Sequence, residues 1–274
     1  MSKEQAHYQF ADELGGIEIL QAHYEKQNFS RHSHEGFTVG IIETGAQRFY
    51  RTGGDHIAPS NSIILVNADE IHNGCSASEG GWSYQAIYPT PEQFAEVNQA
   101  QGLSDNFAPY FTQAVVQDAA LAQLLRNTIH SLNYSSNRLL RESLVYACLS
   151  QLMASHGKSV PPQCSLKPAS KALILVKQCL DEQPAANVSL SELARLVHLS
   201  PCHLAKQFVK RYGMPPHAYQ IQARLRQAKQ LLRQGQPLLK VALDCGFHDQ
   251  SHFHRHFKRA LGVSPGRYAK EVQL

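Results

Sequence analysis

The chain has 274 residues, of which 43% are hydrophobic and 18% are charged, and its formal net charge is +4. This composition lies in the globular range and excludes a largely disordered or collagen-like chain, while the length allows two domains or one large barrel. No apolar run approaches the ~18 residues of a membrane span, and the N-terminal sequence MSKEQAHYQF lacks the apolar stretch of a signal peptide. We therefore expect a cytoplasmic protein without a membrane partner. Six cysteines without a CxxC pair indicate reduced thiols rather than a disulfide framework or a zinc finger.

The first part of the chain has strand patterns followed by helix patterns. Residues 17–90 contain short β-branched and aromatic runs separated by Gly, Asn and Pro turn signals: FTVGIIE, QRFY, SIILVN and WSYQAIY. They predict an antiparallel β domain, either a sandwich or a small barrel. Residues 111–132 and 138–155 then carry apolar side chains at helical spacing. We expect these two segments to form a helical hairpin joined at NYSSN.

A linker separates two halves of opposite charge. The segment HGKSVPPQCSLKP is rich in Pro, Gly and Ser, which is typical of a linker. Residues 1–162 carry 9 Lys and Arg against 16 Asp and Glu, a net charge of −7, whereas residues 163–274 carry 17 against 6, a net charge of +11. The charge difference suggests that only the second half meets a polyanion. We expect an effector-binding and dimerisation domain at 1–158, a linker at 159–168 and a DNA-binding domain at 169–274.

The basic half contains an internal repeat, which is the most specific signal in the sequence. A shift of 49 residues superposes His203 on His252, Lys206 on Arg255, Phe208 on Phe257, Lys210 on Arg259, Gly213 on Gly262, Pro216 on Pro265 and Tyr219 on Tyr268. Each copy predicts a helix-turn-helix. The segment PPHAYQIQARLRQAKQLLRQG between them predicts one helix of about 20 residues, roughly 30 Å long. Two recognition helices held that far apart fit successive major grooves of DNA, which repeat every ~34 Å.

Capping residues place the helix boundaries in both copies. Ser189 and Glu192 predict a capping box, and Ser200 predicts the N-cap of the first recognition helix. In the second copy Gly246 suits a left-handed turn, and Asp249 predicts the N-cap of the second recognition helix. The inward anchors are expected to be Leu204, Phe208, Phe253 and Phe257. The residues left outside are Cys202, His203, Lys206 and Lys210 in the first copy, and Ser251, His252, Arg255, Lys258 and Arg259 in the second.

The basic half resembles the AraC family of bacterial transcription regulators. The residues that carry the resemblance are SLSELARLVHLSPCHLAKQFVKRYGMPPHAY and VALDCGFHDQSHFHRHFKRALGVSPGRY. The resemblance implies seven helices with two helix-turn-helix motifs joined by a long helix. It places the positions that read base edges at Cys202, Ala205 and Lys206, and at Gln250, Ser251, His252 and Arg255. Cys202 and Ala205 offer little hydrogen bonding, so the first motif is expected to discriminate less, or through apolar contact with thymine methyl groups.

The outward cations have different expected partners on DNA. A guanidinium pairs bidentately with guanine O6 and N7, so Arg255 is the first choice for a base contact, with a phosphate contact as the alternative. Lys206, Lys210, Lys258 and Arg259 are expected to contact phosphates.

The acidic half contains a possible metal-ligand pattern. The segments RHSHEGFTVGIIETG and GGDHIAPSNSIILVNADEIHNG resemble the small β-barrel (cupin) sensor domain found in many AraC-family members. His32 and His34 stand at i and i+2, as do Glu70 and His72, so on neighbouring strands they would surround one point. Such a set suits Zn²⁺ or another divalent metal. Enzymatic cupins have a glutamate a few residues after the HxH motif, where this chain has Thr38 and Val39, so the catalytic motif is incomplete.

A pocket for a small-molecule effector is the alternative use of the same domain. Trp82, Tyr84 and Tyr88 alternate along WSYQAIY and, with Arg48, are expected to line it, unless they simply fill the barrel. We expect a one-component transcription regulator, not an enzyme, with double-stranded DNA and an effector as partners, dimerisation through residues 111–155, and RNA polymerase as a further partner of an activator. The alternatives are a metal-dependent cupin enzyme fused to a DNA-binding domain and an architectural DNA-binding protein without sensing.

Overall fold

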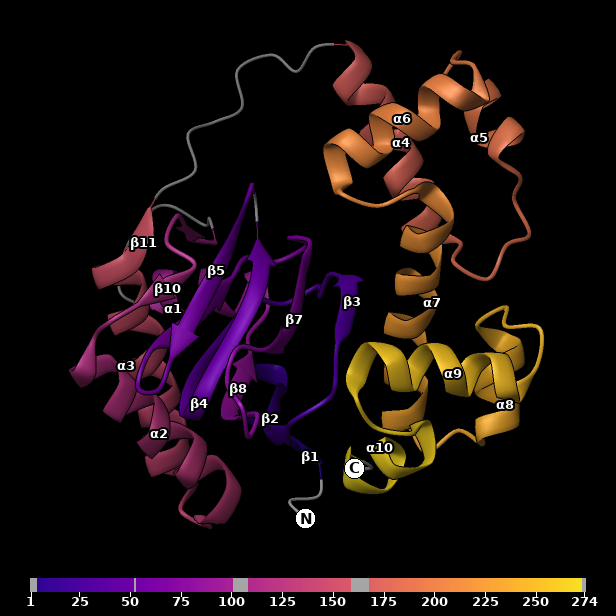
Figure 1. The fold of residues 1–274 in the computed structure, drawn as a ribbon. Coiled ribbons are helices and arrows are strands. Elements are labelled where there is room, and N and C mark those ends of the chain that lie inside the picture. Colours follow the sequence, from indigo (N-terminus) through magenta and orange to yellow (C-terminus); the bar gives the residue numbers. More distant parts are fainter. Residues whose placement is uncertain (1–3, 52, 101–107, 159–167, 273–274) are drawn as a thin grey trace. The chain divides into compact units, whose positions relative to one another are not determined.

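The computed structural model describes residues 4–51, 53–100, 108–158 and 168–272 (Figure 1). Residues 159–167 of the expected linker therefore lie outside the described part. The chain divides into two compact units, residues 1–29 with 33–161 and residues 30–32 with 162–274. Each unit is described by itself, and residues 29–32 are described with the sheet in which they pair. Among the described residues, no helix is both long enough and apolar enough to cross a bilayer.

The first unit is built on an antiparallel sheet, as the strand pattern predicts. Its main path runs in the order β1 (Gln5–Ala11), β2 (Ile17–Tyr24), β8 (Trp82–Tyr88), β4 (Thr38–Arg51), β6 (Ile63–Val66) and β10 (Val115–Val116). Three further strands join off this path: β3 (Phe29–His32) pairs with β7 (His72–Ser76), and both β7 and β5 (Gly54–Pro59) pair with β4. The described ladders confirm an antiparallel sheet domain, but a closed barrel is not confirmed.

Strand β4 joins two runs that the sequence separates. FTVGIIE and QRFY predict two strands with a turn between them, yet residues 38–51 form one strand of 14 residues. The strand pairs with β6 and β8 through its first half and with β5 and β7 through its second half. Its register against β8 shifts between Ile42 and Thr44, and Gly45 adopts a φ of 73°. A bulge and a glycine therefore redirect the strand where a turn was expected.

Helices cover one face of this sheet. Helices α1 (Pro91–Ala100), α2 (Ala119–Tyr134) and α3 (Arg138–His156) share one apolar core with Ile17, Ile19, Val39, Ile41, Ile63, Leu65 and Ile87 of the strands. The expected hairpin is confirmed, with Asn137 as the N-cap of α3. Residues 110–111 and 115–116, however, form the short strands β9 (Tyr110–Phe111) and β10, so the first hairpin helix begins at 119 and not at 111.

The second unit is all-α, and its described residues form seven helices. They are α4 (Pro168–Glu182), α5 (Leu190–Leu196), α6 (Pro201–Tyr212), α7 (Pro216–Arg233), α8 (Leu238–Asp244), α9 (Gln250–Leu261) and α10 (Pro265–Val272). The capping box of Ser189 and Glu192 is present, and Ser200 and Asp249 accept hydrogen bonds from the backbone at the starts of α6 and α9. Gly246 has a φ of 75°. The local sequence signals therefore set these boundaries correctly.

Candidate functional site

Two equivalent helices, α6 and α9, present polar faces. Each helix has 12 residues. An N-cap residue, Ser200 or Asp249, precedes each helix, and a glycine in the left-handed conformation, Gly213 or Gly262, follows it. Leu204 and Phe208 of α6 are fully buried, and so are Phe253 and Phe257 of α9. The predicted inward anchors are therefore confirmed. After the first residue of α6, the exposed side chains are Cys202, His203, Lys206, Val209, Lys210 and Arg211 on α6, and Gln250, Ser251, His254, Arg255, Lys258 and Arg259 on α9.

Helix α7 carries these two helices at its two ends (Figure 1). It has 18 residues, which corresponds to about 27 Å at 1.5 Å per residue. Its apolar stripe includes Tyr219, Leu225 and Leu232, all buried. Both motifs therefore pack on one continuous helix.

His252 departs from the fully outward position expected for it. It is half-buried, and its ring lies against those of Phe247 and His256, with centroid separations of 5.6 Å and 4.6 Å. Burial, and then the nearby His252, His217, Arg255 and Arg259, lower the pKa of His256 below 6.5. The start of α9 thus carries an imidazole pair that packs against the motif, while Arg255 remains exposed one turn later.

The sheet of the first unit has a second buried face, opposite the helices. Paired registers place Glu18 beside Tyr88, Ala22 beside Tyr84 and Tyr24 beside Trp82, and these residues alternate with the core residues that face the helices. The rings of Tyr24 and Trp82 are 5.4 Å apart. Small residues on the same face are Ala6, Ala22, Gly40 and Ala86. Aromatic and small side chains therefore line this face together, which suits contact with a small molecule.

Several tyrosines of this face are electrostatically linked. Burial raises the pKa of Tyr8, Tyr84 and Tyr88 above the ordinary value of 10, and the Tyr84 and Tyr88 side chains share a hydrogen bond. Glu18, which is also buried, raises the pKa of Tyr8 and Tyr88 further. All three phenols are consequently neutral hydrogen-bonding groups. Tyr8 and Glu18 were not predicted from the sequence, although Ala6, Tyr8 and Phe10 alternate along the chain as strand residues do.

Arg48 does not lie on the buried sheet face that carries Tyr84 and Tyr88. Its side chain is exposed, and its register partner in β5 is Ile57, which is also exposed. Trp82 is fully buried, whereas Tyr84 and Tyr88 are partly buried. The three aromatic residues therefore share one buried face of the sheet, whereas Arg48 lies outside that face.

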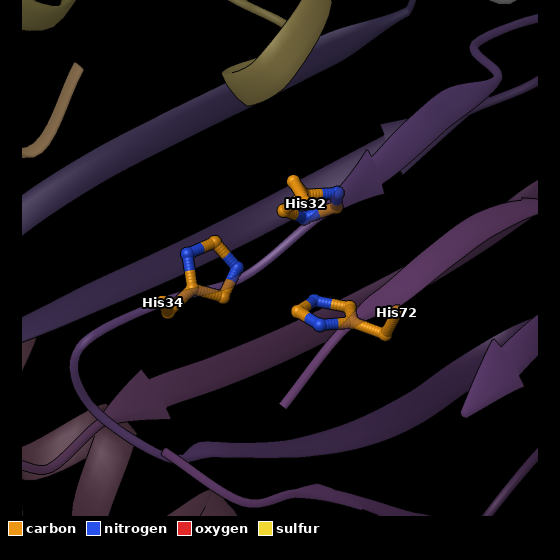
Figure 2. A group of neighbouring side chains, drawn as sticks. All are labelled: His32, His34 and His72. Atoms are coloured by element: carbon orange, nitrogen blue, oxygen red, sulfur yellow. The ribbon is translucent and has the colours of Figure 1, made fainter. Parts of the chain in front are cut away.

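Three histidines come together as the sequence spacing predicts. One ligand nitrogen from each of His32, His34 and His72 lies within 4.8 Å of the other two, and Figure 2 shows the three rings around a common point. His34 also contacts Tyr88, with ring centroids 5.2 Å apart. The cluster thus adjoins the face that carries the tyrosines.

Backbone carbonyls orient two of these rings. Nδ1 of His32 lies 2.7 Å from the Ser30 carbonyl oxygen, and Nδ1 of His72 lies 3.0 Å from that of Glu70. A carbonyl only accepts, so both Nδ1 atoms donate, and the lone pair of each neutral ring is on Nε2. Carbonyls hold the ligating histidines of metal proteins in the same way.

Glu70 is not the fourth member of this group, contrary to the sequence prediction. Its Oε2 accepts hydrogen bonds from Arg51 Nε at 2.6 Å and from the backbone N and side-chain Nδ2 of Asn67 at 3.1 and 2.9 Å. The prediction assumed that Glu70 and His72 share one strand, but β7 begins at His72. Strand alternation therefore does not apply to Glu70, which lies in the preceding turn and pairs with a buried arginine.

Comparison with known proteins agrees with both units. The family model described as the AraC-like ligand binding domain matches residues 14–149, and a helix-turn-helix domain model matches residues 193–271. The uncharacterized HTH-type transcriptional regulator YbfI of Bacillus subtilis (strain 168) is 30% identical over 228 residues, which are 82% of each chain. The chain belongs to the AraC family of transcription regulators. It is thus a DNA-binding regulator with an N-terminal ligand-binding domain, not a cupin enzyme.

Two further proteins match over nearly the whole chain. The transcriptional activator RhaS of Shigella sonnei (strain Ss046) is 24% identical over 260 residues, 90% of this chain and 89% of that protein. The crystal structure of unsaturated fatty acid bound ToxT from Vibrio cholerae has a TM-score of 0.58 at 13% identity, and the match covers 99% of this chain and 98% of ToxT. At that identity the likeness to ToxT shows a shared fold alone.

Proposed function

We propose that this regulator reads two adjacent major grooves with α6 and α9. We further propose that an effector controls this binding from the second buried face of the sheet, which carries Tyr84 and Tyr88 and is called the inner face below. The observation that carries the proposal is the pair of equivalent exposed faces on one connecting helix. Lys206 and Arg255 occupy equivalent positions, one on each recognition helix. The protein acts on DNA in the cytoplasm, as a homodimer that forms through the helical hairpin, with RNA polymerase as a partner when it activates.

Substitutions of Arg255 and Lys258 test whether α9 contacts bases and phosphates of DNA. Binding sites are first selected from random duplexes, and affinities are then measured for a selected and a random duplex at several salt concentrations. Arg255→Ala is expected to cost about 1–3 kcal/mol on the selected duplex and to relax base preference. Lys258→Ala is expected to weaken both duplexes alike and to reduce the salt slope by about one. An equal effect of Arg255→Ala on both duplexes would contradict the base contact.

The inner face favours an effector with hydroxyl groups and flat surfaces. Tyr84 and Tyr88 offer neutral hydroxyls, Trp82 offers a ring, and the buried carboxyl of Glu18 disfavours a carboxylate beside it. This preference differs from the fatty acid bound to ToxT.

A thermal-shift screen of small molecules on the full chain identifies stabilising compounds, because binding to the folded state raises stability. Tyr84→Phe should reduce the shift of a true effector, whereas Tyr134→Phe, an exposed control, should not. Equal shifts in both variants would place the compound elsewhere.

A metal ion is the second candidate ligand, favoured by the histidine cluster. Zn²⁺ bonds of about 2.0–2.1 Å place two ligand nitrogens about 3.4 Å apart, so a small rotation of the rings closes the cluster on an ion. His32, His34 and His72 would hold it, and the open coordination position would accept water or an effector oxygen. Metal content after dialysis against Zn²⁺ should be stoichiometric in the parent and lost in His34→Ala.

Two controls separate metal binding from general effects on the protein. His130→Ala removes an exposed histidine outside the cluster and should keep the metal. Glu70→Gln should also keep it in the folded protein, because Arg51 and Asn67 already engage that carboxylate. A parent protein without bound metal would refute this candidate.

A further inference from the structure

The two helix-turn-helix motifs are joined by more than the connecting helix. Gly246, in the turn between α8 and α9, approaches the loop between α4 and α5, which precedes the first motif. A Cβ at Gly246 would lie 2.7 Å from the Ala185 carbonyl oxygen and 2.8 Å from its Cα. Only glycine permits this approach together with a φ of 75°. The turn of the second motif therefore packs backbone to backbone against a loop of the first half.

Arg224 of α7 bridges these two segments. Its Nε donates to the Pro184 carbonyl at 2.8 Å, its Nη1 to the Gly246 carbonyl at 2.6 Å and its Nη2 to the Ala186 carbonyl at 3.4 Å. One guanidinium thus binds carbonyls that lie 40 residues before it and 22 residues after it in the chain.

Gln220, one turn earlier on α7, reinforces the same contact. Its Nε2 donates to the carbonyls of Pro184 and Ala186 at 3.2 and 2.7 Å, and the residue is buried. Without Arg224 and Gln220, these carbonyls would lose donors in a partly water-excluded site, where an unpaired carbonyl is costly. We name the contact of Arg224 and Gln220 with the three carbonyls the α7 clasp.

Lysine cannot replace Arg224 in this arrangement. The guanidinium is a planar fork whose donors point in fixed directions, whereas an ammonium is a single point charge. Burial lowers the pKa of Arg224 below the ordinary value of an arginine, yet that ordinary value is so high that the group keeps its charge at neutral pH. These three hydrogen bonds of the guanidinium all go to backbone carbonyls, so its charge aligns main-chain dipoles of two different segments.

We propose that the α7 clasp fixes the separation and rotation of α6 relative to α9, so that Arg224 determines which half-site spacing the protein accepts. This inference rests on the proposed two-groove binding. One inserted base pair rotates the second half-site by about 34° around the duplex, given 10.5 base pairs per turn. A rigid pair of recognition helices loses one half-site after such an insertion, whereas a loosened pair still follows both. Arg224 is therefore a positioning residue rather than a DNA contact.

The test compares a selected two-part duplex with the same duplex carrying one inserted base pair between its halves. For the parent, affinity should fall at least about tenfold on insertion, since the contacts of one helix are lost. For Arg224→Lys, the penalty should shrink to less than about threefold, with weaker binding to the original duplex. Affinity for a single half-site should not change, because charge and both recognition faces are retained. Arg233→Lys, on the same helix, is the matched control and should keep the parent's penalty.

Two results overturn the inference in different ways. A full penalty in folded Arg224→Lys shows that the clasp does not set spacing, while two-groove binding stands. If the insertion does not change the affinity of the parent protein, two-groove binding itself is refuted, and the inference with it. If Arg224→Lys fails to fold, as judged by circular dichroism, Gln220→Met removes the second donor with similar volume, with Gln230→Ala, an exposed site on α7, as its control.

Discussion

The pairing of Glu70 with Arg51 predicts a large loss of stability when Glu70 becomes glutamine. The Arg51 side chain is 3% exposed and that of Glu70 is 10% exposed. Arg51 also donates to the carbonyls of Leu65 and Gln113, each at 2.8 Å, and to that of Phe111. Glu70→Gln keeps the size of the side chain but leaves the guanidinium buried without its counter-charge.

Removing one partner of a buried ion pair costs about 3–5 kcal/mol. With a urea dependence of about 1–3 kcal/mol per molar, even a 3 kcal/mol loss lowers the urea midpoint by about 1–3 M. Trp82 reports this transition directly, because it is the only tryptophan of the chain and is fully buried in the first unit. Its fluorescence therefore follows the unfolding of that unit.

Glu142→Gln is the control, because its partner Arg138 is 85% exposed and an exposed pair contributes at most about 1 kcal/mol. A Glu70→Gln midpoint indistinguishable from that of Glu142→Gln would refute the assignment of Glu70 to Arg51. If Glu70→Gln instead kept its stability and lost bound metal, Glu70 would be a metal ligand after all.

Three further predictions concern local geometry. Ser200→Ala and Asp249→Ala should each destabilise the second unit by about 1 kcal/mol in urea unfolding followed by circular dichroism, and unchanged midpoints would contradict the capping roles. Gly81→Ala should destabilise the first unit far more than Gly80→Ala. Both glycines have a positive φ, but only a Cβ at Gly81 would meet backbone, 2.1 Å from the Tyr24 carbonyl oxygen. Equal urea midpoints of Trp82 fluorescence in the two variants would contradict this. Because burial lowers the pKa of His256 below 6.5, its neutral form is favoured in the folded state, so stability is greatest above that pH and falls as the pH drops through the folded pKa. Hydrogen exchange of α9 amides, corrected for intrinsic rates, should show less protection at about pH 5 than at about pH 7.5, and equal protection would contradict it.

The sequence predicted the second unit more closely than the first. Caps at Ser200 and Asp249, inward anchors such as Phe208 and Phe257, and the 49-residue repeat are signals within or near single helices. Helices form from contacts between residues three or four positions apart, so their boundaries can be predicted locally. The exposed faces of α6 and α9 follow from the same periodicity.

The sheet depends on contacts that no local pattern contains. Arg51 binds the Phe111 carbonyl 60 residues away, and this partner network, rather than strand alternation, decides where Glu70 points. The i and i+2 spacing predicted that the three histidines meet, although β3 ends at His32 and His34 follows it outside the strand. The spacing did not show that Tyr8 and Glu18 would join Tyr88 on one face.

The sequence by itself determined that the chain has two recognition helices, an acidic sheet domain and a histidine cluster. Only the tertiary structure decided how the two motifs are joined, because the bridge from Arg224 to Pro184 and Gly246 links segments that precede and follow α7 in the chain. Such a bridge requires the chain to be folded before the donor meets its carbonyls. A repeat therefore specifies two similar motifs, whereas long-range hydrogen bonds specify their mutual geometry.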